Sequence, residues 1–237
     1  MMINRILALG LLLLAAHSAN AQNFLDGAHS FSGSKEAYIT LTNGETITRF
    51  VDKIKRKKGL ISAIELKDAE GKEMALKPEQ VKHMYLAPTG FDNMARETNV
   101  AFNSSKWKDD KSAHAEYIKQ GYVFFETTEV MVKKKKMTLL MQLVNPGFAN
   151  GIKVYFDPWA TETGGLSVGG LQVTGGDNKS YYFKKGDKVA TRIFKKNYDD
   201  EFAGLYSGCD AFKKEFVKNK KWSQVEKHVF FYSENCQ

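Results

Sequence analysis

Residues 36–44, with the sequence EAYITLTNG, decide the fold class of this chain. Polar and apolar side chains alternate up to Asn43-Gly44, the dipeptide that most strongly predicts a tight turn between two antiparallel strands. The alternation resumes over residues 45–54, and an apolar segment at residues 60–66 predicts a third strand. The folded part of the chain is therefore expected to begin with β-hairpins.

The same rhythm continues up to residue 86. Residues 68–71 (DAEG) predict a turn, residues 72–76 a short fourth strand, residues 78–81 a single helical turn and residues 83–86 a closing strand. This order resembles that of small SH3-like and Sm-like β-barrels. The resemblance implies a small β-barrel or sheet domain at residues 36–86, but no activity, because such barrels host many functions.

A second and longer β-pattern covers residues 121–194. Residues 122–132 predict a long strand, four lysines at residues 133–136 mark a hairpin tip, and residues 137–144 predict the returning strand. Further short strands follow, separated by pairs of glycines. Because hairpins that follow one another in sequence pair antiparallel, we expect a larger antiparallel meander here.

Three segments surround these β-regions. Residues 22–35 are polar and lack periodicity, which predicts a flexible leader, and the charged, turn-rich residues 87–120 predict a linker or junction. Residues 195–237 carry apolar side chains at helical spacing and predict a helical tail. The expected fold class is mainly β, a β-rich α+β chain with a small N-terminal barrel or sheet, an antiparallel sheet and a C-terminal helical tail.

The first 21 residues have the features of a cleavable secretory signal peptide. Arg5 precedes an apolar run at residues 6–16, and Ala19-Asn20-Ala21 places small residues where a signal peptidase requires them. The run is shorter than the ~20 apolar residues of a spanning helix, and no later segment approaches that length. We therefore expect an exported, not membrane-spanning protein that is periplasmic or extracellular, with peripheral contact to the outer membrane left open.

Cys209 and Cys236 are the two cysteines of the chain. In the oxidising compartment that a signal peptide implies, an isolated pair predicts a disulfide bond. The alternatives are two free buried thiols or a redox pair, although the C-x-x-C spacing of a redox pair is absent.

The chain is basic, with 35 basic residues against 27 acidic ones and a formal net charge of +8. This charge could favour anionic partners; the alternative is a soluble lysine-rich surface, because acidic residues are interspersed through most of the chain. Two basic runs lie at predicted hairpin connections: Lys53, Lys55, Arg56, Lys57 and Lys58, and Lys133, Lys134, Lys135 and Lys136. They could bind anionic lipid or polysaccharide, or they could simply keep strand edges from pairing with other chains. The partner stays unknown at this point: an envelope protein, a glycan or an anionic surface are candidates, and nucleic acid is a poor partner for an exported protein.

No arrangement of residues in the sequence indicates nucleophilic catalysis or metal binding. The histidines of the mature chain are scattered and lack the spacing of a zinc site; they are His29, His83, His114 and His228. The Gly-x-Ser-x-Gly pattern at residues 165–169 lacks the preceding strand and following helix that a nucleophile elbow requires. We therefore predict no catalytic residue, no metal and no cofactor.

Pairs of carboxylates, which glycoside hydrolysis requires, are the remaining catalytic pattern. Glu126 and Glu129 have opposite parity on one predicted strand and would face opposite sides of the sheet. Asp157 and Glu162 flank Trp159, and a tryptophan beside acidic residues can line a sugar site. Asp157, Trp159 and Glu162 are therefore our candidate ligand-binding residues; the alternative is a wide turn whose tryptophan caps the core.

The chain as a whole resembles uncharacterised secreted proteins of Gram-negative bacteria of the Bacteroidota type. The shared features are the signal peptide, the small β-unit, the segment Ser180–Asp187 and a helical tail with a cysteine. We expect a non-catalytic envelope or extracellular module with a binding or structural role; the alternative is a secreted hydrolase of an envelope or dietary polymer. A deep cleft with two converging carboxylates would favour the hydrolase, and a shallow patch rimmed by lysines or aromatic residues would favour the binding module.

Overall fold

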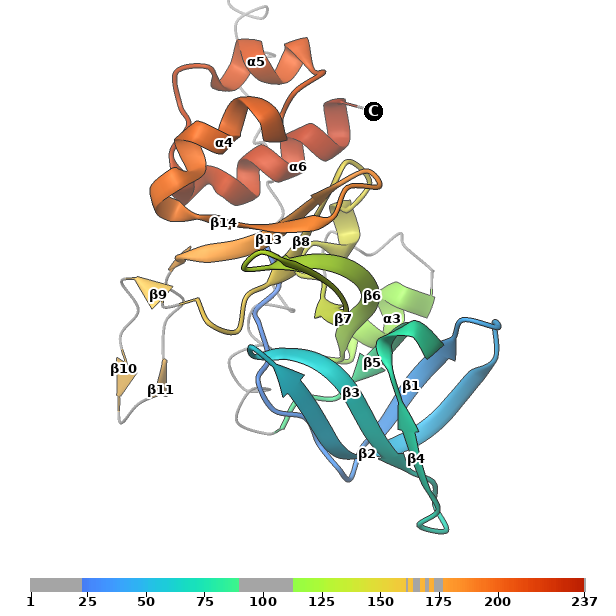
Figure 1. The fold of residues 1–237 in the computed structure, drawn as a ribbon. Coiled ribbons are helices and arrows are strands. Elements are labelled where there is room, and N and C mark those ends of the chain that lie inside the picture. Colours follow the sequence, from blue (N-terminus) through green and yellow to red (C-terminus); the bar gives the residue numbers. More distant parts are fainter. Residues whose placement is uncertain are drawn as a thin grey trace, which may run out of the picture.

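The computed structural model describes residues 23–89, 113–160, 162–163, 167–168, 171–172 and 177–236. The predicted signal peptide and residues 90–112 of the predicted junction lie outside these residues, so both remain predictions. Strands dominate the described chain and helices gather at its C-terminal end, which confirms the expected β-rich fold class (Figure 1).

Six strands close into an antiparallel β-barrel. They are β1 (Glu36–Leu41), β2 (Thr46–Lys57), β3 (Leu60–Lys67), β5 (Val81–Leu86), β6 (Val123–Val132) and β7 (Lys135–Gln142). Neighbours around the barrel follow the order β3-β2-β1-β5-β6-β7, and the ring closes where Ile61 of β3 lies opposite Leu140 of β7. A short strand, β4 (Glu73–Leu76), pairs with the second half of β3. At the level of the fold, this barrel is consistent with the small SH3-like or Sm-like barrels that the sequence resembles.

The barrel takes two of its six strands from beyond residue 120. Residues 36–86 alone would leave β5 and the first part of β3 with open edges, and β6 and β7 cover these edges. Phe125 and Leu140 from the two added strands are buried in the same core cluster as Ile39, Ile61 and Met84. The small β-unit is thus completed by the longer β-region, because a closed ring leaves no unpaired edge at these strands.

Three further strands extend the sheet beyond the barrel in the order β6-β14-β13-β8. They are β8 (Ile152–Phe156), β13 (Ser180–Lys185) and β14 (Ala190–Phe194). β13 pairs antiparallel with both of its neighbours, as a meander requires, but β14 runs parallel to β6. The reason is the number of reversals along the chain. From β6 to β7, to β8, to β13 and to β14 each step is antiparallel, and four reversals bring β14 back to the direction of β6.

Short elements complete the β-part of the molecule. β9 (Glu162–Thr163) pairs with β12 (Asp177–Asn178), and β10 (Ser167–Val168) pairs with β11 (Leu171–Gln172). Single 3-10 turns lie at Pro78–Gln80, Pro146–Phe148, Lys195–Asn197 and Trp222–Gln224.

Three helices cover one face of the β8–β13–β14 sheet (Figure 1). They are α4 (Tyr198–Leu205), α5 (Asp210–Phe216) and α6 (Val225–Asn235), whereas α3 (Ala113–Lys119) belongs to the core on the other side of the sheet. Tyr198, Phe202 and Leu205 are buried, as their i, i+4, i+7 spacing predicts. Among the described residues, none of the helices combines the length and the apolar character needed to cross a membrane.

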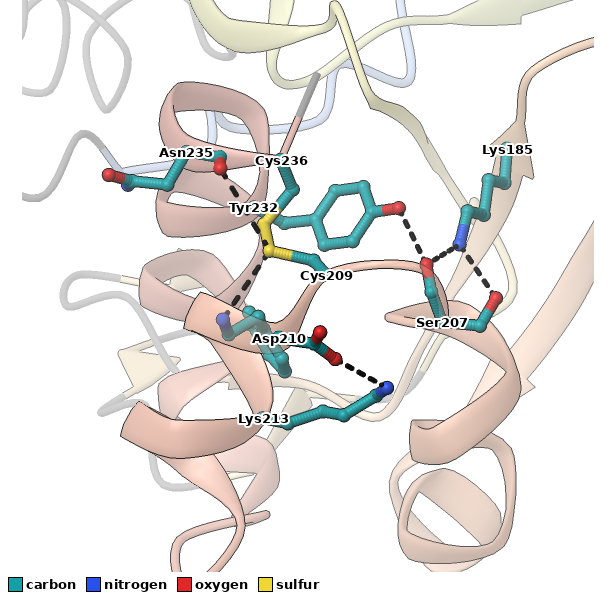
Figure 2. A network of polar contacts seen from close by, with 9 residues as sticks. Lys185, Ser207, Cys209, Asp210, Lys213, Tyr232, Asn235 and Cys236 are labelled. Carbon is teal, nitrogen blue, oxygen red and sulfur yellow. Dashed lines mark hydrogen bonds and ion pairs between the residues drawn. A yellow bond between two sulfur atoms is a disulfide. The ribbon is translucent and has the colours of Figure 1, made fainter.

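The predicted disulfide bond joins Cys209, at the start of α5, to Cys236, at the end of α6 (Figure 2). Close to it, Lys185 of β13 donates hydrogen bonds to the carbonyl oxygen and hydroxyl of Ser207, at 2.8 and 3.0 Å. The Tyr232 hydroxyl donates to the same carbonyl at 2.9 Å. The loop between α4 and α5 is therefore fastened both to the sheet and to α6.

His228 of α6 is buried among the aromatic rings of the helical layer. Its Nδ1 lies 2.8 Å from the hydroxyl of Tyr198, which is itself 2.7 Å from the hydroxyl of Tyr206. Burial, followed by the positive charge of Lys227, lowers the pKa of His228 to about 4. The folded protein therefore holds this imidazole neutral at pH values where the unfolded chain protonates it.

We expect this histidine to make the fold sensitive to acid. Because the pKa is lower in the folded state, its contribution is complete above the unfolded value of 6.5 and is lost as the pH falls towards 4. The loss should reach about 2–3 kcal/mol at pH 4.5, at ~1.4 kcal/mol per pH unit. Urea unfolding of the wild type and of His228→Asn at pH 7.5 and 4.5 tests this. The variant should lose less stability between the two pH values, and an equal loss in both proteins would contradict the assignment.

Candidate functional site

A cavity of about 430 Å³ lies where the ends of β13 and β14 meet the turn that follows β8. Its lining residues are Trp159, Ala160, Lys179, Ser180, Arg192, Phe194, Lys195 and Lys196. The strand register explains why segments distant in sequence meet here. Ser180 pairs with Phe194 across β13 and β14, and Tyr181 pairs with Phe156 across β13 and β8, which places the turn at residues 157–160 beside them.

Asp157, the first of the predicted site residues, lies beneath the cavity and is almost completely buried. Its carboxylate forms an ion pair with Arg192 Nε and accepts a hydrogen bond from the Ser180 hydroxyl at 2.6 Å. Its other oxygen accepts one from the Trp159 backbone N–H at 3.1 Å. Both carboxylate oxygens are therefore occupied, and Asp157 acts on the cavity by orienting Arg192 and the turn that carries Trp159.

Arg192 forms one wall of the cavity and is held on two sides. Its Nε and Nη2 lie 3.3 and 3.2 Å from Ser180 Oγ, and its guanidinium carbon lies 4.5 Å from the centre of the Phe194 ring. A guanidinium has five N–H donors in a rigid plane. Asp157 and Ser180 thus occupy the edge of the guanidinium formed by Nε and Nη2, and Nη1 has no hydrogen-bond partner among the described residues.

Trp159, the second predicted residue, is 63% exposed and so does not cap the core. The edge of its indole lies against Gly59, at the tip of the β2–β3 hairpin, where a Cβ atom would come within 2.0 Å of the indole nitrogen. Gly59 also has a φ of +78°, in the left-handed region that favours glycine. The indole therefore contacts the hairpin tip along one edge, while most of its surface stays open to solvent.

Glu162, the third predicted residue, begins β9, and its backbone pairs with Asn178, the residue before Lys179. The side chain of Glu162 lies outside the part of the chain that the structure describes.

Three lysines supply the rim of the cavity. Lys179, Lys195 and Lys196 are exposed, and the ammonium group of Lys196 lies 5.8 Å from the centre of the Phe194 ring. Within the described ranges, none of the three lysines is ion-paired with a carboxylate, and no carboxylate belongs to the lining. The cavity is therefore electropositive, with aromatic rings at its wall and mouth.

The two basic runs predicted as surface patches do not line this cavity. In the first run, Lys55 pairs with Glu65 at 2.5 Å. Arg56 donates to the carbonyl oxygens of Gly59 and His29 at 2.9 and 2.7 Å, so it supports the hairpin tip on which Trp159 rests. In the second run, Lys136 pairs with Glu129. The remaining members of both runs are exposed: Lys53, Lys57, Lys58, Lys133, Lys134 and Lys135.

A second polar cluster surrounds Glu126 on β6. Its carboxylate accepts hydrogen bonds from Lys153 Nζ at 2.7 and 2.9 Å and from the Tyr155 hydroxyl at 2.6 Å. Burial, followed by the charge of Glu126, raises the pKa of Tyr155 well above its ordinary value, so its hydroxyl remains a donor. The cluster links β6 to β8. Glu129, of opposite parity on β6, pairs with Lys136 instead and does not join Glu126 in a carboxylate pair.

In the parts of the chain that the structure covers, no group of three or more histidine, cysteine, aspartate or glutamate residues is placed to hold a metal ion. Comparison with protein-family models, with curated protein sequences and with solved structures found no match. The resemblance to secreted proteins of the Bacteroidota type therefore remains a prediction.

The sequence singled out Asp157 and Trp159, which lie beside and in the lining of this cavity, but it did not indicate the residues that give the cavity its charge. Arg192, Ser180 and Phe194 are ordinary strand residues when the sequence is read alone. The pair Lys195-Lys196, directly after a predicted strand, could have indicated a positively charged site. The prediction named the two longer basic runs instead.

Proposed function

We propose that this chain is an exported, non-catalytic binding module of the cell envelope or extracellular space, and that its anionic ligand binds in the cavity beside Trp159. The observation that carries the proposal is the composition of that cavity. Arg192 and three rim lysines surround an exposed indole, and no carboxylate of the described residues belongs to the lining. Cations around a concave site with an aromatic wall favour an anion that is recognised by both charge and shape.

One further observation supports a binding module over a hydrolase, and another supports export. The acidic residue closest to the cavity, Asp157, is engaged with Arg192 and Ser180. A general acid or nucleophile in glycoside hydrolysis needs a carboxylate that reaches the substrate, together with a second one across the cleft. The disulfide bond between Cys209 and Cys236 supports an oxidising compartment, which agrees with the predicted signal peptide.

Charge reversal at the rim tests the proposal. We expect Lys195→Glu/Lys196→Glu to weaken binding by at least 10-fold, because it puts two negative charges where the ligand's anion would lie; 10-fold corresponds to about 1.4 kcal/mol. Three anionic probes cover the candidate partners: phosphatidylglycerol vesicles, polyglutamate and polygalacturonate. Cosedimentation and fluorescence anisotropy at 50 and 300 mM salt measure the affinity, which should fall with salt.

The matched control is Lys72→Glu/Lys77→Glu, which makes the same change of charge at exposed positions beside β4, at the opposite end of the strand order from β14, β13 and β8. Its affinity should stay within about three-fold of the wild type, because long-range attraction at a distant site is largely screened by salt. Equal losses in the two variants would show that net charge alone drives binding, and a failure to bind all three probes would reject the proposed function.

A further inference from the structure

We infer that the ligand of this cavity is an acidic saccharide, in which a sugar ring carries or adjoins a carboxylate or sulfate group. The inference rests on the proposed function and narrows it to one chemical class. Two features of the cavity carry it: a single uncovered aromatic platform and a preorganised cation beside that platform.

The platform is the indole of Trp159. The other aromatic residue of the lining, Phe194, is covered by the guanidinium of Arg192 at 4.5 Å and approached by the ammonium group of Lys196 at 5.8 Å. Trp159 is 63% exposed and packs along one edge against Gly59, so its ring is accessible and is supported by the hairpin tip. Such a site can stack one ring of a ligand without first having to order the tryptophan.

A sugar ring fits an open platform of this kind better than the other anionic candidates. One face of a pyranose presents C–H groups, which pack on an aromatic ring, while its edge presents hydroxyl groups to polar surroundings. A lipid chain would need an enclosed apolar channel, whereas the rim here consists of three lysines. An acidic peptide has no ring of its own that requires the platform, unless it carries an aromatic residue.

The cation beside the platform specifies the acidic group. Asp157 and Ser180 hold Arg192 in one orientation, and the unused donors of its planar guanidinium match the paired oxygens of a carboxylate or sulfate. Lys179, Lys195 and Lys196 add charge at the rim and can follow an acidic polymer out of the cavity. A neutral sugar would leave the three rim lysines without an anionic partner among the described residues.

Isothermal titration of the purified protein with two acidic tetrasaccharides, tetragalacturonate and a chondroitin sulfate fragment, tests the inference. Each is compared with its own neutralised form, made by methyl esterification or by desulfation with esterification. We expect at least one acidic form to bind and its neutral form to bind at least 10-fold more weakly. Trp159→Ala should weaken binding by at least 10-fold, and Trp159→Phe should restore most of the affinity because it restores a stacking face.

A pair of glycine variants separates the placement of the indole from general damage to the fold. Gly59→Ala puts a methyl group into the indole, whereas Gly44→Ala, at a turn with a φ of +89°, meets nothing within 4 Å. Both changes strain a left-handed turn. Affinity should fall about 10-fold in Gly59→Ala and stay unchanged in Gly44→Ala; equal effects would contradict the role of Trp159 as a fixed platform.

The outcomes distinguish this inference from the proposed function. One outcome is that the protein binds phosphatidylglycerol vesicles or polyglutamate at the Lys195–Lys196 rim and binds neither tetrasaccharide. That result overturns the saccharide inference and still supports the proposed function. Equal affinity for an acidic tetrasaccharide and its neutral form also overturns the inference. If no anionic probe binds, the saccharide inference and the proposed function are both rejected. Binding of an acidic form that is lost on neutralisation and in Trp159→Ala supports both.

Discussion

Replacing Asp157 by alanine should lower the free energy of unfolding by about 3 kcal/mol, since removing one partner of a buried ion pair leaves the other charge uncompensated. Asp157 is 1% exposed, and it joins Arg192, Ser180 and the Trp159 backbone at the end of the sheet. Arg192 retains some exposure, at 29% of its side chain, so the cost falls at the lower end of the range for buried pairs. Urea unfolding at pH 7 measures this loss.

Two controls separate the buried pair from an ordinary ion pair. Glu129→Ala removes the partner of Lys136 on the surface, where both side chains are about half exposed, and should cost less than about 1 kcal/mol. The double variant Asp157→Ala/Arg192→Met removes both charges and should regain part of the lost stability while binding remains lost. A single Asp157→Ala variant as stable as Glu129→Ala would contradict the positioning role that we assign to Asp157.

The second large effect is expected at the disulfide bond. Cysteines 209 and 236 are 27 residues apart, and closing a loop of this length stabilises the folded state by about 3–4 kcal/mol in the chain-entropy model. The Sγ of Cys209 also accepts a hydrogen bond from the Phe212 backbone N–H at 3.4 Å and thereby caps α5. Loss of the bond should therefore loosen α5 and α6 before it affects the barrel.

Urea unfolding of the wild type with and without dithiothreitol measures this contribution, and the double variant Cys209→Ser/Cys236→Ser provides the control. The reduced wild type and the variant should both be about 3–4 kcal/mol less stable than the oxidised protein. Reductant should have no further effect on the variant. Hydrogen exchange should speed up more in α5 and α6, through local opening, than in β1 to β3. A loss below about 1 kcal/mol would contradict the expectation.

Local signals predicted much of this fold. Asn43-Gly44 gave the turn between β1 and β2, where Gly44 has a φ of +89°. The helical spacing of Tyr198, Phe202 and Leu205 predicted the face of α4 that is buried. The turn and the helix face are each decided by residues within a few positions of one another. The disulfide bond was predictable for another reason, because the chain has two cysteines and they can pair in one way.

The closure of the barrel and the composition of the cavity were not predictable in the same way. Ile61 meets Leu140 across 79 positions of chain, and nothing local in either segment identifies its partner. Asp157 and Trp159 stood out because an acid, a proline and a tryptophan cluster in one turn. Arg192 joins them only through the register of β8, β13 and β14, and register between distant strands is set by packing of the whole sheet.

The most direct test of the central claim, that an anionic ligand binds beside Trp159, is a titration followed by the indole N–H signals in ¹⁵N–¹H NMR spectra. The chain has three tryptophans, and Trp159→Phe assigns the relevant signal. Trp222 is buried beneath the helical layer and donates its indole N–H to the Asn178 carbonyl at 2.8 Å, so it serves as an internal reference. On addition of an acidic oligosaccharide, the Trp159 signal should shift in a saturable way, with little change at Trp222. A ligand that binds while the Trp159 signal stays still would contradict the account.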